Sequence, residues 1–271
     1  MKRNRIVTIA LTLIFLAGLS MLLYPTVSEL WNSFHQSRAI TDYTEQVDDM
    51  DPDMYRKIWE NAESYNRKLA EDPDRFAMTE EEKAVYEQQL SVSDDGIMGS
   101  VEVPEIGCSL PVYHGTDESA LQTAIGHLEG SSLPTGGKGT HCVLSGHRGL
   151  PSARLFTDLD ELTEGDIFIL NVLDRTMTYE VDQILTVDPY DLEALAIDPE
   201  EDYCTLVTCT PYGINTHRLL VRGHRIPNLP ENEIGQEFAK ERTALAAASA
   251  ALVISAVTIG IVLLVRIRRR I

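Results

Sequence analysis

The sequence predicts a mainly β domain, built as a closed or nearly closed β-barrel, with a long apolar helix at each end of the chain. Seven short runs rich in β-branched and aromatic residues lie between residues 93 and 226, separated by Gly, Pro, Asn and Asp. Two longer runs, at residues 6–24 and 243–265, carry no charge. Each is about the length that a helix needs to cross a bilayer.

Basic residues flank the two apolar runs at the chain ends. The chain begins MKRNR, and RIRRRI follows the second run. The positive-inside rule therefore predicts two membrane spans, with both termini in the cytoplasm and residues 25–242 outside. A cleaved signal peptide is the alternative for the first run, but no small-x-small cleavage site follows it. A buried core helix is the alternative for the second run, and the four arginines after it favour a span.

The region between the two runs is strongly acidic. Seven of the 23 Lys and Arg residues lie in the terminal tails, which leaves 16 basic and 42 acidic residues outside, a net charge of −26. Such a surface repels phosphates, so no nucleic-acid partner is expected. The sequence shows no metal-ligand cluster and no phosphate-binding loop, so no metal and no cofactor are expected.

Residues 25–92 carry helical patterns. One face of a helix is predicted from apolar residues spaced three or four apart, namely Tyr55, Ile58, Trp59, Ala62, Tyr65 and Leu69. A second helix is predicted in TEEEKAVYEQQL, with Thr79 as its N-cap and acids in its first turn. Between them EDPDRFAM interrupts the pattern, because Pro73 and the residue before it resist helix.

The run YCTLVTC ends in a cysteine. Alternation along a strand places Val207 and Cys209 on one face and Cys204 on the other. Pro211 stops the strand and HRLLVRGH returns beside it, so we expect Cys209 and Arg218 to face each other across the mouth of a hairpin. A thiol at a strand end is accessible to substrate, which predicts a nucleophile.

A thiol nucleophile needs a proton acceptor, usually a histidine. His147 ends the predicted strand HCVLSGH, and this position matches that of Cys209, so neighbouring strands can bring the two side chains together. His224 lies six residues from Arg218, about 20 Å along an extended chain, and is too far away. On spacing alone, other histidines stay open as alternatives: His114, His127, His141 and, on the face opposite Arg218, His217.

Three stretches together resemble the sortases, which are membrane-anchored transpeptidases of Gram-positive bacteria. They are PVYHGTDESALQTAIGHLEGSSLP, VLSGHRGLPSARLFTDLDEL and TLVTCTPYGINTHRLLVRGH. The resemblance runs from about residue 60 to residue 225 and is greatest to the class C, pilus-building branch. It implies an eight-stranded sortase-type β-barrel with short helices. It also implies that Cys209 is the catalytic nucleophile, His147 the catalytic histidine and Arg218 the catalytic arginine.

The same resemblance implies a reaction. Sortases cleave a Leu-Pro-x-Thr-Gly sorting signal between Thr and Gly through a thioacyl-enzyme and join it to an amine. In pilus-building relatives the amine is a pilin lysine; in housekeeping relatives it belongs to a cell-wall precursor, which is the alternative here. A non-catalytic membrane scaffold is the alternative outside the enzymes. The stretch NLPEN before the second apolar run faintly resembles a sorting signal, but the Thr-Gly pair is missing.

The class C branch carries a lid over the active site, usually Asp-Pro followed at once by an aromatic residue. The matching stretch here is Asp72-Pro73-Asp74, with Phe76 two places late. The resemblance assigns Asp72 to pair with Arg218 and Phe76 to cover Cys209. An ordinary acidic turn between helices is the alternative.

Cys142 and Cys204 each precede a proposed catalytic residue by five positions. Their alternation puts both off the catalytic face, and we expect two free buried thiols rather than a disulfide. The complete predicted order is a cytoplasmic tail at 1–5, a transmembrane helix at 6–24, an extracellular helical segment with a lid at 25–92, a sortase β-barrel catalytic domain at 93–226, a linker at 227–242, a transmembrane helix at 243–265 and a basic cytoplasmic tail at 266–271.

Overall fold

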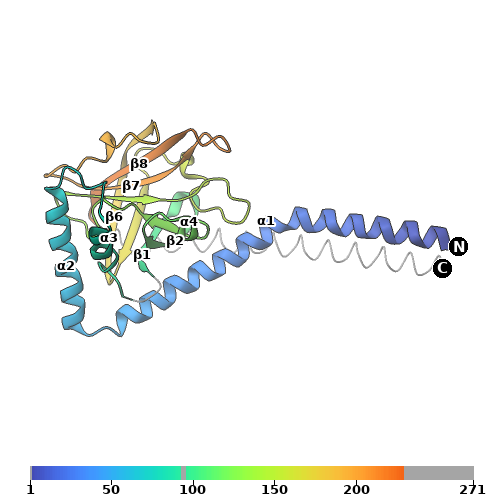
Figure 1. Ribbon diagram of the computed structural model, residues 1–271, viewed down its shortest axis with the longest axis horizontal. Helices are drawn as coiled ribbons and strands as arrows, with labels where there is room; N and C mark the ends of the chain where they lie inside the picture. Colours follow the sequence, from blue (N-terminus) through green and yellow to red (C-terminus); the bar gives the residue numbers. More distant parts are fainter. Residues whose placement is uncertain (1, 93–95, 229–271) are drawn as a thin grey trace. The chain divides into compact units, whose positions relative to one another are not determined.

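The computed structural model describes residues 2–92 and 96–228, and in this part of the chain eight strands close into a barrel (Figure 1). Around the barrel the strands follow in the order β1-β2-β3-β4-β7-β8-β6-β5. Their bounds are β1 Ile97–Val103, β2 Cys108–His114, β3 Ile125–His127, β4 Thr140–Ser145, β5 Ile167–Val172, β6 Arg175–Val187, β7 Asp202–Thr210 and β8 His217–Ile226. The predicted eight-stranded barrel is confirmed.

All seven predicted runs contain a strand of this barrel. The eighth strand, β3, was not predicted from the residues, because a segment of three residues is too short to show alternation. It is nevertheless needed for closure, since it pairs with β2 in parallel and with β4 in antiparallel fashion. The other parallel pair is β4 with β7, and the remaining neighbours are antiparallel.

Alternation along β7 divides its side chains between two apolar clusters. Cys204 and Leu206 belong to the main core, which fills the barrel. Val207 belongs to a smaller group on the outer face of the sheet, which we name the outer cluster. Its buried members are Val143, Leu195, Val207 and Leu220.

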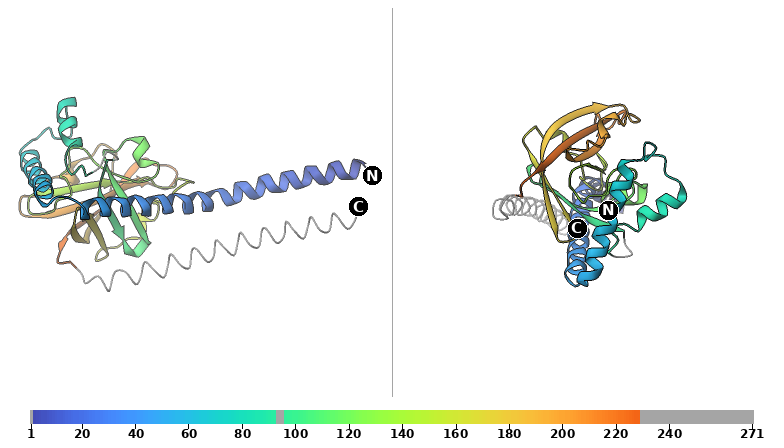
Figure 2. Two further views of the ribbon diagram at one scale, coloured as in Figure 1. Left: turned by 90° about the horizontal axis from the view of Figure 1, so that it is seen from below. Right: turned by 90° about the vertical axis from the view of Figure 1, so that its left-hand side faces the viewer.

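In the described part of the chain, four α-helices lie outside the barrel, and Figures 1 and 2 show α2 and α3 against its outer surface. Their bounds are α1 Lys2–Asp48, α2 Pro52–Ala70, α3 Glu80–Glu87 and α4 Glu118–Leu121. Short 3-10 turns follow β1, precede β5 and precede β7, as η1 Pro104–Ile106, η2 Leu159–Glu161 and η3 Glu193–Leu195.

Helix α1 contains the first predicted span. It is long and apolar enough to cross a membrane, and its apolar part is exposed. The helix does not end near residue 24 but runs on to Asp48, through Pro25. Its last turns join the barrel, because the Tyr43 hydroxyl donates to the Met98 carbonyl at 3.0 Å and accepts from the Leu173 N–H at 2.9 Å. The second predicted span, at 243–265, lies outside the described residues.

Helices α2 and α3 begin at the residues that the sequence marks. Asp51 caps α2 by accepting from the backbone N–H groups of Asp53 and Met54. Thr79 caps α3 in a reciprocal box with Glu82, so the predicted N-cap is confirmed. The two helices frame the segment that contains the predicted lid.

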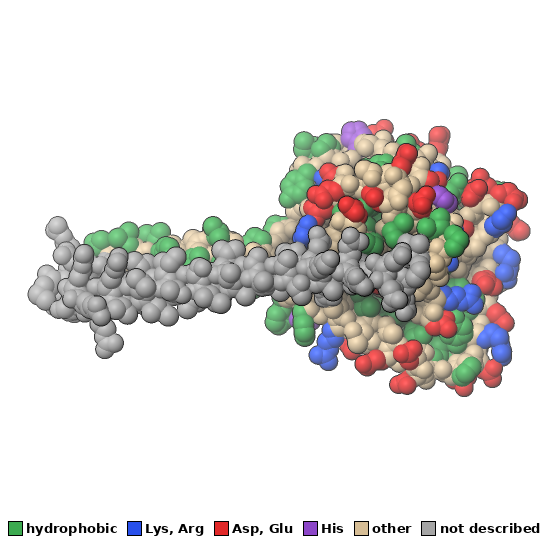
Figure 3. Space-filling model, turned by 180° about the vertical axis from the view of Figure 1, so that it is seen from behind, with side chains coloured by type: hydrophobic (Ala, Val, Ile, Leu, Met, Phe, Trp, Pro, Cys, Tyr) green, Lys and Arg blue, Asp and Glu red, His purple; other side chains and the backbone are tan. Residues whose placement is uncertain are grey.

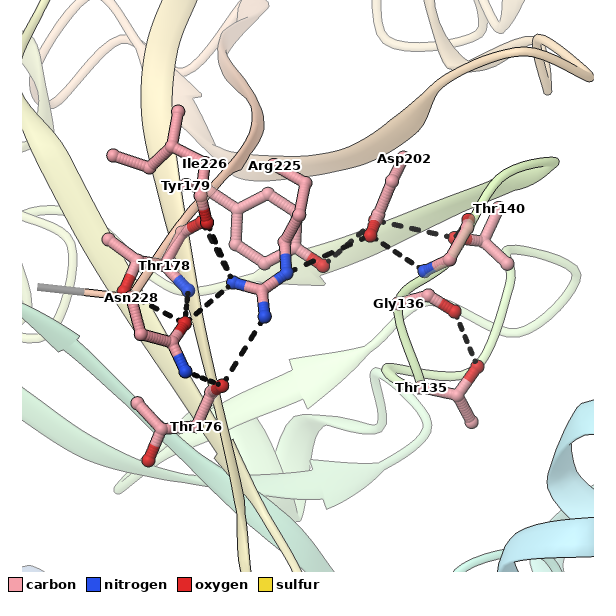
Figure 4. Close-up of polar contacts among 11 residues, drawn as sticks. Thr135, Gly136, Thr140, Thr176, Thr178, Tyr179, Asp202, Arg225, Ile226 and Asn228 are labelled. Atoms are coloured by element: carbon pink, nitrogen blue, oxygen red, sulfur yellow. Dashed lines mark hydrogen bonds and ion pairs between the residues drawn. The ribbon is translucent and has the colours of Figure 1, made fainter.

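A polar network closes the end of the barrel opposite Cys209 (Figure 4). Asp202, at the start of β7, accepts from the Tyr179 hydroxyl at 3.0 Å and from the Gly137 N–H at 2.6 Å. Arg225, near the end of β8, donates to the Thr178 carbonyl at 3.1 Å and to the Asn228 side chain at 2.9 Å. The buried polar groups of this network are hydrogen-bonded to one another, so we assign the network a structural role.

The predicted acidity is visible on the surface. Figure 3 shows Asp and Glu side chains spread over one face of the domain, with fewer Lys and Arg. Two of the exposed apolar side chains farther along α1 are aromatic: Trp31 is 67% and Phe34 is 63% exposed.

Candidate active site

The β7–β8 hairpin carries two of the predicted site residues. Cys209 and Arg218 are directly paired in the antiparallel ladder, next to its last pair. Cys209 is partly exposed, whereas Cys108, Cys142 and Cys204 are buried. The predicted juxtaposition of Cys209 and Arg218 at the hairpin mouth is confirmed.

His147 reaches the same level from β4. The last pair of the parallel β4–β7 ladder is Ser145 with Val207. The contact continues past the strand, because the Gly146 N–H donates to the Val207 carbonyl at 3.0 Å. His147 lies two residues beyond Ser145, just past the end of β4, and Cys209 lies two residues beyond Val207 on β7. Neighbouring strands are about 4.8 Å apart. The structure thus places Cys209 and Arg218, on adjacent strands, and the loop that carries His147 at one end of the barrel.

The turn that carries His147 depends on a glycine. A Cβ at Gly146 would lie 2.7 Å from the ring of Phe156, which is fully buried. The Gly146 carbonyl accepts from the Thr208 hydroxyl at 2.8 Å, and the His147 carbonyl accepts from the Phe156 N–H at 3.2 Å. Packing and hydrogen bonds therefore fix the backbone of His147 from two sides.

The guanidinium of Arg218 contacts a backbone carbonyl rather than another charged side chain. Its Nη1 donates to the neighbouring His217 carbonyl at 3.2 Å. The nearby carboxylate of Asp188 lies 3.6 Å from the His217 ring and pairs with it. Within the described part of the chain no ion pair includes Arg218, so its guanidinium is available to a substrate oxygen.

A second arginine braces the loop of His147. The side chain of Arg148 is only 9% exposed and forms an ion pair with Asp160. Its Nη1 lies 3.5 Å from the hydroxyl of Thr210, the residue after Cys209, and its guanidinium carbon lies 5.7 Å from the Tyr212 ring centroid. Arg148 thus links the His147 loop to the end of β7.

A residue that the sequence did not single out faces His147. Glu118, the first residue of α4, places its Oε2 atom 3.6 Å from Nε2 of His147. This distance is longer than a hydrogen bond, and among residues 2–92 and 96–228 the buried Nε2 atom has no hydrogen-bond partner. No sequence signal indicated the pair, because the two residues are far apart in the chain and meet only in the folded barrel.

The other candidate histidines are held in contacts of their own. Nδ1 of His141 lies 2.8 Å from the Ala196 carbonyl, and its Nε2 lies 2.8 Å from the Thr205 hydroxyl. Burial lowers the pKa of His141 from 6.5 to about 4, although the bond to Ala196 opposes the shift. The remaining three are engaged as well: His114 with two backbone carbonyls, His127 with a buried tyrosine and a backbone carbonyl, and His217 with the Thr216 hydroxyl.

Phe76, one of the two predicted lid residues, packs against the outer cluster. That cluster includes Val207, which precedes Cys209 by two residues on the same face of β7. Phe76 therefore covers the sheet surface that leads to the thiol, although it stands two places later than the usual lid aromatic.

Arg75, the neighbour of Phe76, anchors this segment. Its guanidinium donates to the Gly130 carbonyl at 2.7 Å and to the Leu195 carbonyl at 2.8 Å. It also stacks over the Phe76 ring, 4.3 Å from the centroid. Asp72 is not paired with Arg218 in the described residues; its carboxylate accepts from the Asp74 N–H at 2.9 Å. The suggested Asp72–Arg218 pair is thus absent, because Asp72 closes the local turn while Arg75 reaches the barrel.

Cys142 and Cys204 are neighbours inside the barrel. They are paired in register on β4 and β7, and both belong to the main core. Both are free thiols in this structure, as expected. They lie on the opposite face of the sheet from Val207 and Cys209.

No three His, Cys, Asp or Glu side chains among residues 2–92 and 96–228 form a group suited to a metal ion. The absence of a metal and of a cofactor from the whole protein stays a prediction.

Comparison with known proteins agrees with this arrangement. A family model described as the sortase domain matches residues 101–226. Sortase C1 from Streptococcus agalactiae has a TM-score of 0.68 and 55% sequence identity, over 71% of this chain and 100% of that chain. Sortase C from Streptococcus pneumoniae has a TM-score of 0.62 and 45% identity, over 71% of this chain and 99% of that chain.

More distant relatives match a shorter part of the chain. Sortase D from Bacillus subtilis is 31% identical over 47% of this chain and 63% of its own length. Sortase A from Streptococcus agalactiae is 27% identical over 42% of this chain and 47% of its own length. The chain thus spans about half to two-thirds of these two relatives. Since it covers the whole of a sortase C1 domain at 55% identity, the chain belongs to the sortase family, in its class C branch.

Proposed function

We propose that this protein is a membrane-anchored cysteine transpeptidase that cleaves a Leu-Pro-x-Thr-Gly-like sorting signal and joins it to an amine. One observation supports this most: Cys209, the His147 loop and Arg218 lie on adjacent strands at one end of the barrel, in a chain of the sortase family. A scaffold that only binds a partner has no need for this arrangement of thiol, imidazole and guanidinium.

In the proposed reaction Sγ of Cys209 attacks the threonine carbonyl carbon. The C–N bond to glycine breaks, and the departing amine takes a proton from His147. An incoming amine then attacks the thioacyl carbon and gives a proton to His147, while the C–S bond breaks and the thiolate returns. Arg218 donates to the carbonyl oxygen as negative charge develops there.

The segment around Phe76 would act as a lid. Phe76 rests on the outer cluster, and Arg75 holds the segment by two backbone carbonyls. Covering part of a phenyl ring stabilises the closed form by about 1–2 kcal/mol, which leaves opening accessible at ambient temperature. A sorting signal would displace Phe76 and occupy the outer face of β7 and β8. Asp72 would serve the lid by shaping its turn, without pairing with Arg218.

Pilus assembly is the favoured role, with a pilin lysine as the acceptor amine. Support comes from class C neighbours: the structure of the Streptococcus pneumoniae relative is described in terms of pilin substrate specificity, and another neighbour is a sortase C1 of a pilus island. Anchoring of surface proteins to a cell-wall precursor is the second candidate. Competition between a lysine-bearing pilin peptide and a wall-precursor amine distinguishes the two.

We place the protein in the cell membrane, with the catalytic domain outside. Helix α1 supplies one apolar segment, and the exposed Trp31 and Phe34 follow it, where aromatic residues favour the lipid–water boundary. The second span at 243–265 and the cytoplasmic position of both termini rest on the sequence.

The test uses the full chain in detergent micelles with a Leu-Pro-x-Thr-Gly peptide and a lysine peptide as acceptor. We expect mass spectrometry to find cleavage between Thr and Gly and an amide-linked product, both lost in Cys209→Ala. No cleavage by the wild type, nor by the lid variant Phe76→Ala, would support the scaffold instead.

A further inference from the structure

The pair of Glu118 and His147 is the least expected feature of the site. Glu118 Oε2 lies 3.6 Å from His147 Nε2, and this buried nitrogen has no hydrogen-bond partner in the part of the chain that the structure describes. A buried polar atom without a partner costs free energy, which a small approach of the carboxylate would recover. The carboxylate is thus placed to receive an N–H from the imidazole when Nε2 is protonated.

The topology of the barrel explains why Glu118 reaches this place. β2 and β3 are parallel, so the chain must return from the end of β2 to the start of β3, and α4 lies in that crossover. The start of β3 is level with the end of β4, because Gly126 pairs with Ser145. The crossover therefore ends beside the turn that carries His147.

Glu118 is also held by its own helix. The side chain of Gln122, one turn later, donates to Oε1 of Glu118. This leaves Oε2 facing His147. An unrestrained glutamate at the surface would lose side-chain entropy on forming an ion pair, and the bond from Gln122 reduces that loss.

An ordinary surface ion pair is the competing interpretation, because the Glu118 side chain is 73% exposed. Such pairs add little to stability. Their effect on a titrating partner is a separate matter, since a carboxylate within about 4–6 Å favours the charged form of a base. His147 is only 27% exposed, so solvent screens it from the carboxylate less than it would screen a fully exposed ring.

Those charges have opposite effects on the imidazolium form. A cation such as Arg218 on β8 would disfavour it, whereas a thiolate at Cys209 on β7 would favour it; Arg148 beside His147 is already paired with Asp160. Once the thiol is acylated no thiolate charge is left, and among the described residues Glu118 is the carboxylate that faces the ring. At that stage His147 must take a proton from the incoming amine.

We propose that Glu118 is a positioning residue that orients the His147 ring and favours its protonated form during the transfer to the amine. The role of Glu118 in turnover rests on the proposed function, but its pairing with His147 does not. Gln122 supports it by fixing the other carboxylate oxygen.

The pairing is tested without turnover, in the full chain carrying Cys209→Ala, in detergent micelles. Selective ¹³C labelling of histidine and NMR titration give the pKa of His147, assigned by its loss in His147→Gln. Glu118→Gln is expected to lower that pKa by about 0.5 unit, and about 1 M salt should remove most of the difference. Glu164→Gln, an exposed acid in the turn before β5, serves as the control and should change nothing.

A pKa of His147 that is the same in Glu118→Gln and in the control would overturn the pairing. If Glu118→Gln fails to fold, Gln122→Ala gives a second test. This variant keeps the Glu118 carboxylate but removes the bond that holds it, so it should lower the pKa of His147 by a smaller amount. In the active chain, Glu118→Gln should move the alkaline limb of the pH–kcat/KM profile to lower pH, and Glu118→Asp should restore part of it. If the shift appears but no peptide is cleaved, the pairing stands and the proposed function fails.

Discussion

Gly130 lies directly against Phe76: a Cβ at position 130 would come within 2.8 Å of the Phe76 ring and 2.4 Å of the Arg75 carbonyl oxygen. The close approach fits the bond by which Arg75 holds the Gly130 carbonyl. One glycine therefore permits the segment between α2 and α3 to lie flat on the barrel.

Gly130→Ala is expected to lift this segment and expose Cys209. Alkylation of Cys209 by iodoacetamide should become roughly 3- to 10-fold faster, because a larger fraction of molecules has the lid open. The matched control is Gly165→Ala, where φ is +96° instead of +84° but a Cβ meets no atom within 4 Å. Both variants carry similar backbone strain, so equal alkylation rates in the two would refute the lid.

Arg218→Lys is expected to lower kcat of the peptide reaction by about 100-fold with a smaller change in KM. Lysine keeps the positive charge but loses the planar fork that can donate to the developing oxyanion. The measurement is steady-state kinetics with the sorting-signal peptide. Arg56→Lys, at an exposed position on α2, is the control; a kcat for Arg218→Lys near that of the control would remove Arg218 from the proposed mechanism.

His141 makes the fold sensitive to acid. Its pKa is about 4 in the folded chain instead of 6.5, so the unfolded chain binds more protons between these values. Above pH 6.5 the ring is neutral in both states, and His141 does not reduce the stability of the fold. As the pH falls from 6.5 to about 4, the unfolded chain gains a proton that the folded chain does not, and this stability is lost. The loss is at most about 3 kcal/mol from this group.

Chemical unfolding at a series of pH values tests this dependence. The free energy of unfolding of the wild type should fall more steeply between pH 6.5 and 4 than that of His141→Gln, which has no titrating ring. Parallel curves for the two proteins would show that His141 is protonated equally in both states.

Cys142 and Cys204 should both remain thiols, because they lie paired in register in a packed core that reagents do not reach. Together with Cys108 and Cys209 they make four free thiols. Titration of the unfolded, unreduced chain with a thiol reagent should count all four. A lower count would indicate a disulfide.

The strands and the pairing of Cys209 with Arg218 could be predicted because their signals are local. Alternation along YCTLVTC gave the face of Cys209, and Pro211 gave the place where its strand ends. Spacing alone left several histidines open, and the choice of His147 rested on the resemblance to the sortases. The parallel β4–β7 pair places His147 beside the strand of Cys209, and its catalytic role stays a prediction.

Other features depend on contacts between residues far apart in the chain, so they could not be predicted from the sequence. Strand β3 has three residues, and it exists because β2 and β4 supply its hydrogen bonds. Glu118 meets His147 only through the crossover between β2 and β3. Arg75 anchors the segment between α2 and α3 through backbone carbonyls, which any residue at those positions would present, so no sequence pattern reveals it.

The most direct test of the proposed chemistry is to locate the acyl group itself. The full chain with Gly130→Ala is mixed with a sorting-signal peptide in the absence of an amine, quenched in acid and digested for mass spectrometry. We expect the mass of the peptide up to its threonine on the fragment that contains Cys209, and we expect this adduct to be absent after Cys209→Ala. Cleaved peptide without that adduct, or an adduct on another residue, would contradict it.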